Sequence, residues 1–295
     1  MKHGALRAQP IRGRFTGKLR LISTAALFAT IALWADPSHG PKNGYLIING
    51  GAGNTEDVPR LIQMAGGPNA RIVVIPTASI AQPLAPGALD HFCASPANFS
   101  ATHCTVLHTT DRSVADSEAF VKPLQDATGV WIVGGRQWRL ADAYLNTRTE
   151  KELFNLLDRG GVIGGGSAGA TIQGSFLIRG QAHPDDNRVM IAPDGHTVGF
   201  GFVTNVAIDQ HVDAREREND LAVVIKAHPE LLGIGLDQGT SITVHGDEFV
   251  VNGPHRVAVW DGKDHGGKGY YYLHTGDRFD LATRVATIAP DNAAK

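Results

Sequence analysis

Cysteine is scarce in this sequence, since only Cys93 and Cys104 occur among its 295 residues. Neither belongs to a motif with the cysteine and histidine spacing of a zinc site, so we expect no metal. The two cysteines form one local disulfide bond if the compartment is oxidising, or they remain two structural thiols. Their separation along the chain leaves both alternatives open.

An excess of charge of either sign is also missing. The chain has 27 Lys and Arg against 29 Asp and Glu, for a formal net charge of −2. Nucleic-acid-binding proteins usually have a basic face, so we expect no nucleic-acid partner. With 42% hydrophobic and 19% charged residues, the composition is that of an ordinary globular protein.

No apolar run is as long as the roughly 20 residues that a membrane span needs. Residues 1–20 contain Lys and Arg but no acid, and residues 21–35 are apolar and uncharged, as in a signal peptide. We therefore predict a signal peptide over residues 1–40, cleaved between Ala32 and Gly40, and export to the periplasm or outside the cell. An uncleaved N-terminal anchor is the alternative; once the leader is removed, we expect no stable membrane association.

The remainder shows no linker, repeat or low-complexity segment, which favours one domain over residues 41–295. Short apolar runs alternate with helical patterns, which is typical of a parallel sheet covered on both faces. From residue 200 onward the chain is rich in strand patterns and resembles a β-meander over 233–262. The expected strands are 45–50, 71–79, 104–109, 129–135 and 161–165, and the expected helices include 116–125, interrupted at Pro123, and 214–227.

One glycine-rich segment fits two functional templates. Read as Gly164-x-Gly166-x-x-Gly169, it is a dinucleotide-binding fingerprint. Read as Gly165-x-Ser167-x-Gly169, it is a nucleophile elbow. The fingerprint normally opens its fold, and it needs an acid at the end of the next strand. Here the segment lies past the middle of the chain, and the acids at the right distance follow a His-Pro pair in a polar loop.

The nucleophile elbow is the better interpretation. A strand feeds a tight turn, and we expect the small residues Gly165, Gly166, Ala168 and Gly169 to be sterically required around Ser167. The following helix offers free N–H groups to a developing oxyanion. A structural serine in a turn rich in glycine and alanine is the alternative.

A serine nucleophile needs a base. His211 ends an apolar run 44 residues after Ser167, so it also lies at a strand end. Arg215 and Arg217 follow, and they have the geometry to bind a substrate carboxylate through paired hydrogen bonds. A solvated helix face, with neighbouring glutamates as partners, is the other interpretation of this run.

Taken together, the motifs over residues 45–262 resemble those of the cyanophycinase-like serine peptidases, which are related to peptidase E. The motifs are VVIPTAS, VGGRQ, GGGSAGA, DQH-x3-R-x-R and GIGLDQGT. The resemblance implies a class I glutamine amidotransferase-like (flavodoxin-like) α/β fold: a mostly parallel sheet sandwiched by helices, with a C-terminal β-meander. We do not expect a true glutamine amidotransferase, because its elbow would hold a cysteine and both cysteines lie elsewhere.

The resemblance also implies roles for individual residues, and neither a metal nor an organic cofactor. Ser167 corresponds to the nucleophile and His211 to the general base, with Asp185 as the third member of the triad and Asp186 as the alternative. The backbone N–H groups of Gly135 and Ala168 would form the oxyanion hole. The substrate-binding residues would be Gln137, Asp209, Gln210, Arg215 and Arg217.

Three positions depart from the family pattern. Asp220 stands where a third arginine is usual, Arg136 where an acid is usual, and Gln238 where a glutamate is usual. We therefore predict an exported serine exopeptidase for aspartyl peptides of the β-Asp-Arg, cyanophycin-like type. The alternatives are an α-aspartyl dipeptidase or other small-peptide hydrolase, and a non-catalytic binding protein. We expect a peptide substrate as partner and leave a homodimer open.

Overall fold

A computed structural model describes residues 1, 38–52, 56–80, 87–89, 91–94, 103–181 and 189–293. Nearly all of the expected leader lies outside the described residues, and so do Asp185 and Asp186. Residues 37–295 form one compact unit. None of the helices in the described residues is long and apolar enough to span a membrane.

Five parallel strands form one half of the larger sheet, as the alternating pattern predicts. Each is a short, mostly apolar run, and β1, β5, β4 and β2 are buried along most of their length. Their carboxyl ends therefore meet at one edge, which is where sites form in open α/β sheets. In spatial order the strands are β1 (Tyr45–Asn49), β5 (Val162–Gly166), β4 (Gly129–Ile132), β2 (Arg71–Ile75) and β3 (His103–Val106).

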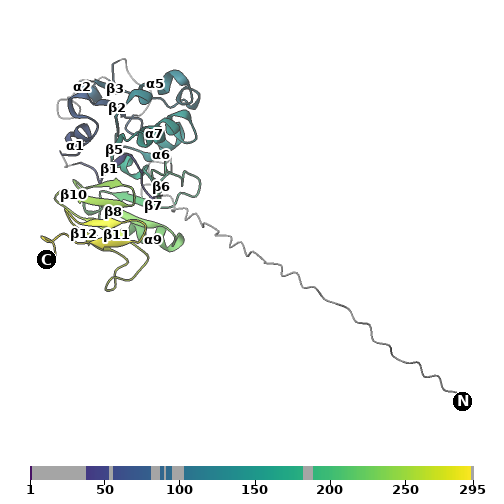
Figure 1. Ribbon diagram of the computed structural model, residues 1–295, viewed down its shortest axis with the longest axis vertical. Helices are drawn as coiled ribbons and strands as arrows, with labels where there is room; N and C mark the ends of the chain where they lie inside the picture. The colour runs from purple at the N-terminus through teal and green to yellow at the C-terminus, as the bar shows by residue number, and fades with distance from the viewer. Residues whose placement is uncertain are drawn as a thin grey trace, which may run out of the picture. The chain divides into compact units, whose positions relative to one another are not determined.

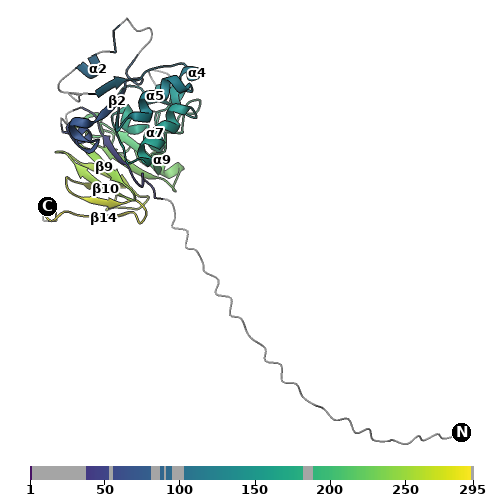
Figure 2. The ribbon, with the colours of Figure 1, turned by 45° about the horizontal axis from the view of Figure 1, so that its top comes forward.

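Helices cover both faces of this parallel half (Figures 1 and 2). Side chains alternate along a strand, so Ile72 and Val74 of β2 pack in one core cluster, while Val73 and Ile75 belong to another. One face is covered by α1 and α2, the other by α5, α6 and α7. The described helices here are α1 (Asp57–Met64), η1 (Gly67–Asn69), α2 (His91–Ala94), α4 (Arg112–Ala115), α5 (Glu118–Asp126), α6 (Gln137–Tyr144) and α7 (Arg148–Asp158).

The C-terminal strands are present, but they divide between two sheets and do not form one meander. The hairpin of β9 and β10 pairs with β1 on the side away from β5, which extends the first sheet and covers the end of its parallel half. That extension consists of β9 (Ser241–His245), β10 (Glu248–Asn252), β13 (Arg278–Asp280) and β14 (Val285–Thr287). The second sheet has the order β12 (Tyr271–Leu273), β11 (Val257–Trp260), β8 (Leu232–Leu236), β7 (Val203–Gln210) and β6 (Gly174–Phe176).

Two helix expectations are wrong in detail. The helix expected to break at Pro123 continues through it as α5. Pro123 has no N–H to donate to the carbonyl of Ala119, but Ala119 is exposed, so water can take the place of that donor. The helix expected over 214–227 is split into η3 (Asp213–Arg215) and α9 (Asp220–Ala227). Between them Glu216 has a φ of 52°, a left-handed conformation that ends the first turn.

The two cysteines are joined. Cys93 of α2 and Cys104 of β3 form a disulfide bond with a Cα–Cα distance of 5.8 Å. The bond links a short helix to the edge strand of the first sheet. Of the two alternatives that the sequence leaves open, the disulfide is therefore the correct one.

Candidate active site

Ser167 lies in the turn between β5 and the short helix α8 (Ala168–Thr171). Its φ of 55° and ψ of −115° are rare for a residue other than glycine, and such strain is typical of a nucleophile elbow. Its carbonyl accepts hydrogen bonds from the N–H groups of Ala170 at 2.9 Å and Thr171 at 3.0 Å. The first turn of α8 therefore holds the serine backbone in this conformation.

The small residues around Ser167 are required at two positions and not at a third. A Cβ on Gly165 would lie 2.4 Å from the carbonyl oxygen of Gly169. A Cβ on Gly169 would lie 2.1 Å from the carbonyl oxygen of Ile132. At Gly166 the nearest atom would be 3.4 Å away, an ordinary contact. The steric expectation is confirmed for Gly165 and Gly169 and is wrong for Gly166.

His211 follows β7 directly, and its side chain reaches Ser167. The imidazole Nε2 lies 3.1 Å from Ser167 Oγ, which is hydrogen-bond distance. Like the serine, His211 has a positive φ, 55°, and its N–H donates to the carbonyl of Gly50 at 2.8 Å. Two residues 44 positions apart in the sequence thus meet where β5 and β7, strands of two different sheets, end, in the geometry that a nucleophile and its base require.

The imidazole rests on Gly51, the residue after Gly50. A Cβ built on Gly51 would lie 1.9 Å from His211 Cε1, and Gly51 has a φ of 120°. Both the contact and the conformation exclude a side chain here. Gly51 therefore defines the surface against which the imidazole packs.

The pKa of His211 is lowered from its ordinary range to about 4, first by burial and then by the nearby cations Arg215 and Arg217. The carboxylates of Asp209 and Asp213 oppose this shift. His211 is therefore neutral near pH 7, which is the form that can accept a proton.

A carboxylate that orients His211 is not found among the described residues. Asp185 and Asp186, expected in this role, lie outside them. Within the described part of the chain, no carboxylate accepts a hydrogen bond from His211 Nδ1. Asp213, two residues on, instead accepts the N–H of Gln238 at 2.7 Å. The third triad member remains a prediction.

The turn of Gly134 and Gly135 lies against the serine. A Cβ on Gly134 would be 3.1 Å from Ser167 Cβ, and Gly135 has a φ of 139°. The backbone N–H groups of Gly135 and Ala168 donate to no acceptor in the described parts of the chain. Both are therefore available to a negative oxygen that develops beside Ser167.

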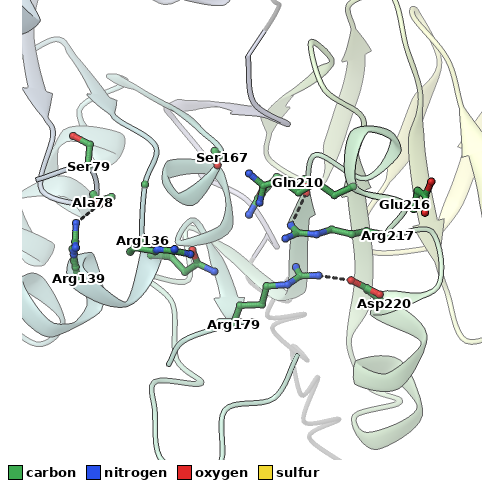
Figure 3. Close-up of a pocket in the computed structure, with 13 residues that line it drawn as sticks. Ala78, Ser79, Arg136, Arg139, Ser167, Arg179, Gln210, Glu216, Arg217 and Asp220 are labelled. Carbon is green, nitrogen blue, oxygen red and sulfur yellow. Dashed lines mark hydrogen bonds and ion pairs between the residues drawn. The ribbon is translucent and has the colours of Figure 1, made fainter. Parts of the chain in front are cut away.

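A cavity of about 980 Å³ opens at Ser167. In Figure 3, Ser167 lies between a group of residues around Arg139 and a second group around Gln210 and Asp220. The lining of the cavity includes cations, two acids and two amides, so groups of both charges meet there. These residues are Arg136, Gln137, Arg139, Arg179, Gln210, Arg215, Glu216, Arg217 and Asp220.

Four of the five expected substrate-binding residues line this cavity, and Asp209 does not. Asp209 is fully buried and forms ion pairs with Arg179 and Arg217 behind the cavity wall. Arg179 also binds Asp220, one of the positions that departs from the family pattern (Figure 3). Asp209 therefore supports the arginines that line the cavity.

Arg215 differs from the buried arginines. It is exposed, and its guanidinium makes no ion pair or hydrogen bond with any described residue. Arg217 is buried, which lowers its pKa to about 10, and it donates to the carbonyl of Gln210 at 3.0 Å. Arg217 therefore stays charged at neutral pH, while Arg215 is the cation open to a ligand.

Motif analysis missed Arg179 and Arg139. Arg179 is 4% exposed and directly follows the mostly apolar run SFLI. A charged residue at the end of a buried segment is unusual, and this was the signal in the sequence that could have identified it as a functional residue. Arg139 has no such signal; its guanidinium donates to the carbonyls of Ala78 at 3.2 Å and Ile80 at 3.0 Å. In the described residues, no three His, Cys, Asp or Glu side chains gather in a way that could hold a metal ion.

Comparison with known proteins identifies the family. The sequence model of peptidase family S51 matches residues 46–252, more than half of the chain, with Ser167 and His211 inside the match. The chain belongs to peptidase family S51. It is therefore a serine peptidase-type hydrolase.

Relatives of this S51 peptidase include cyanophycinases. The cyanophycinase of Geminocystis herdmanii is 29% identical over 228 residues, covering 75% of this chain and 82% of the relative. That of Synechococcus elongatus is 32% identical over 236 residues, covering 77% and 70%.

Solved structures share the fold of this S51 peptidase. A peptidase from an acI-B1 actinobacterium superposes with a TM-score of 0.62 at 22% identity, over 82% of this chain and 98% of the other. A putative peptidase E from Listeria monocytogenes gives a TM-score of 0.50 at 15% identity, over 72% and 99%. The expected α/β fold, with its mostly parallel sheet between helices, is confirmed.

Proposed function

We propose that this S51 peptidase is a serine-type exopeptidase that hydrolyses aspartyl peptide bonds of the β-Asp-Arg, cyanophycin-like type. The observation that supports this most directly is the 3.1 Å contact of Ser167 Oγ with His211 Nε2 beside a cavity lined with charges of both signs. Its cyanophycinase relatives support the substrate class.

In the proposed reaction, Ser167 Oγ bonds to the carbonyl carbon while His211 Nε2 takes the hydroxyl proton. The N–H groups of Gly135 and Ala168 donate to the oxyanion. His211 then gives the proton to the leaving nitrogen, the C–N bond breaks, and an acyl-enzyme remains. Water then attacks this ester while His211 takes a proton from the water. His211 returns that proton to Ser167 Oγ as the ester C–O bond breaks, which releases the acid and restores the serine. Asp185 is proposed to hold the imidazole tautomer.

The lining of the cavity supports a substrate that has both a carboxylate and a cationic donor group. Arg215, open and without a partner among the described residues, suits a carboxylate. Gln210 is 4% exposed and lines the cavity, and its buried Oε1 has no partner among the described residues, so it suits an N–H donor. Asp220 adds negative charge, with 36% of its side chain exposed.

The substrate is tested by incubating the purified mature protein with cyanophycin and, separately, with α-aspartyl dipeptides, and identifying the products by mass. We expect β-Asp-Arg dipeptides and a higher kcat/KM on cyanophycin. Faster hydrolysis of α-aspartyl dipeptides would favour the dipeptidase alternative. Turnover of neither substrate would contradict aspartyl specificity.

We also propose that the protein is exported. The basic start followed by an apolar run supports a cleaved leader. The disulfide between Cys93 and Cys104 supports an oxidising compartment. N-terminal sequencing of the mature protein should place its first residue between Ala32 and Pro41, and an intact Met1 would contradict cleavage.

The acid limb of kcat/KM is expected near pH 4, where His211 of the free enzyme becomes protonated. Because the charge of Arg215 lowers the pKa of His211, Arg215→Gln should move this limb to higher pH. The measurement is kcat/KM between about pH 3 and pH 8.

The matched control for this pH profile is Arg139→Gln. It removes a cation from the same cavity that is not among the groups acting on His211. The acid limb should stay in place in this variant even if KM rises. An unmoved limb in Arg215→Gln would show that Arg215 does not act on the base.

A further inference from the structure

We propose that Asn49, the last residue of β1, is a positioning residue that holds the nucleophile turn and the surface beneath the general base in one arrangement. This inference rests on the proposed roles of Ser167 and His211. Asn49 is 5% exposed, and its backbone carbonyl and both side-chain polar atoms are hydrogen bonded.

The first bond reaches the nucleophile. The N–H of Ser167 donates to the backbone carbonyl of Asn49 at 3.0 Å. Asn49 pairs with Gly166 in the parallel ladder of β1 and β5, so this bond extends the ladder by one residue into the elbow. The orientation of the strained Ser167 peptide therefore depends on where Asn49 lies.

The second bond reaches the base through Gly51. Asn49 Oδ1 accepts the N–H of Gly51 at 2.7 Å, which fixes the turn that follows β1. Within this turn, Gly50 accepts the N–H of His211, and Gly51 packs against its imidazole. A shift of Asn49 Oδ1 would therefore move the imidazole relative to Ser167 Oγ.

The third bond uses the nitrogen of the Asn49 amide. Its Nδ2 donates to Asp57 Oδ2 at 2.5 Å. A backbone N–H only donates hydrogen bonds, so the amide must turn its oxygen toward Gly51 and therefore its NH₂ toward Asp57. Asp57 is held by Ser241 Oγ at 2.8 Å and Arg60 Nη1 at 2.6 Å.

A buried amide and carboxylate are costly unless they are fully paired, and apolar residues would fill the same space without that cost. Here Asn49 bonds directly to the backbone N–H of Ser167 and reaches the imidazole of His211 through Gly51, and it also lines a second, smaller hollow of about 260 Å³ beside Ser167. Positioning explains why this location holds a polar pair.

The test exchanges the two groups. Asn49→Asp keeps an acceptor for Gly51 but sets two carboxylates against each other. We expect a 10- to 100-fold lower kcat with little change in KM, since a misplacement of about 1 Å costs on this order. The double variant Asn49→Asp/Asp57→Asn restores a donor and acceptor in reversed order, and should recover kcat to within about threefold of the starting protein.

The rate at which a fluorophosphonate probe labels Ser167 is measured alongside kcat, because it does not depend on the peptide substrate. If the unmodified protein is not labelled, the proposed function fails. If it is labelled and folded Asn49→Asp is labelled equally fast, the positioning role is overturned. If Asn49→Asp does not fold, the double variant decides: recovery supports the role, and a folded but slow protein overturns it.

The control for stability alone is Thr149→Ala in α7. Thr149 is fully buried, and its hydroxyl donates to the carbonyl of Ala115 at 2.7 Å, away from the cavity. This variant should lower the Tm while its labelling rate and the acid limb of its pH profile stay unchanged. If Thr149→Ala slows labelling as much as Asn49→Asp, the effect at Asn49 is one of general stability and the proposal is overturned.

Discussion

Ser167→Ala is expected to lower kcat on aspartyl peptides by about 10⁴- to 10⁶-fold, the range seen when a serine nucleophile is removed. The variant loses only Oγ, so the charged lining of the cavity and the N–H groups of Gly135 and Ala168 remain. Alanine meets the same positive φ as serine, so the Tm should change little. The measurements are kcat by product mass, substrate binding by calorimetry, and Tm.

The matched control is Ser79→Ala, which removes a second hydroxyl from the same cavity. Ser79 Oγ donates to the carbonyl of Pro76 at 2.8 Å and contacts no base. The variant should still be labelled at Ser167 by the fluorophosphonate probe. Full hydrolysis by Ser167→Ala would contradict the assignment of the nucleophile.

Gly51→Ala is expected to lower kcat/KM by about 100-fold, although it replaces neither of the two reacting side chains. The new Cβ would lie 1.9 Å from His211 Cε1, so either the imidazole or the turn must move. In both cases the contact of 3.1 Å between His211 Nε2 and Ser167 Oγ is lost. The measurements are kcat/KM, Tm and the labelling rate of Ser167.

Gly262→Ala separates the clash from backbone strain. Gly262 also has a positive φ, 81°, but a Cβ there would meet nothing within 4 Å. This control should lose stability by roughly 1 kcal/mol from strain and keep its activity. A Gly51→Ala protein with the starting rate would show that the imidazole does not depend on this surface.

Local sterics explain why the strained turn at Ser167 could be predicted. A serine between glycines after an apolar strand has few conformations open to it, and the clashes at Gly165 and Gly169 confirm that reasoning. Where the local argument was too general, it failed. Gly166 has room for a side chain, and the turn at Glu216 divides a segment whose pattern indicates one helix.

Contacts between distant segments were not predictable in the same way. Arg179 lies 30 positions before Asp209, and Ser241 lies 184 positions after Asp57, yet each pair is in direct contact. Such pairs depend on strand order and on which sheet a strand joins. No periodicity or short motif contains that information.

The sequence by itself determined the parallel α/β architecture, the strained turn at Ser167 and the placement of His211 at a strand end, because these depend on hydrophobic alternation and on the space around single residues. Only the tertiary structure decided that Cys93 and Cys104 are bonded, that Asp209 supports arginines behind the cavity wall, and that Asn49 joins the serine turn to the surface under His211. These features depend on distances between residues far apart in the chain, and folding alone sets those distances.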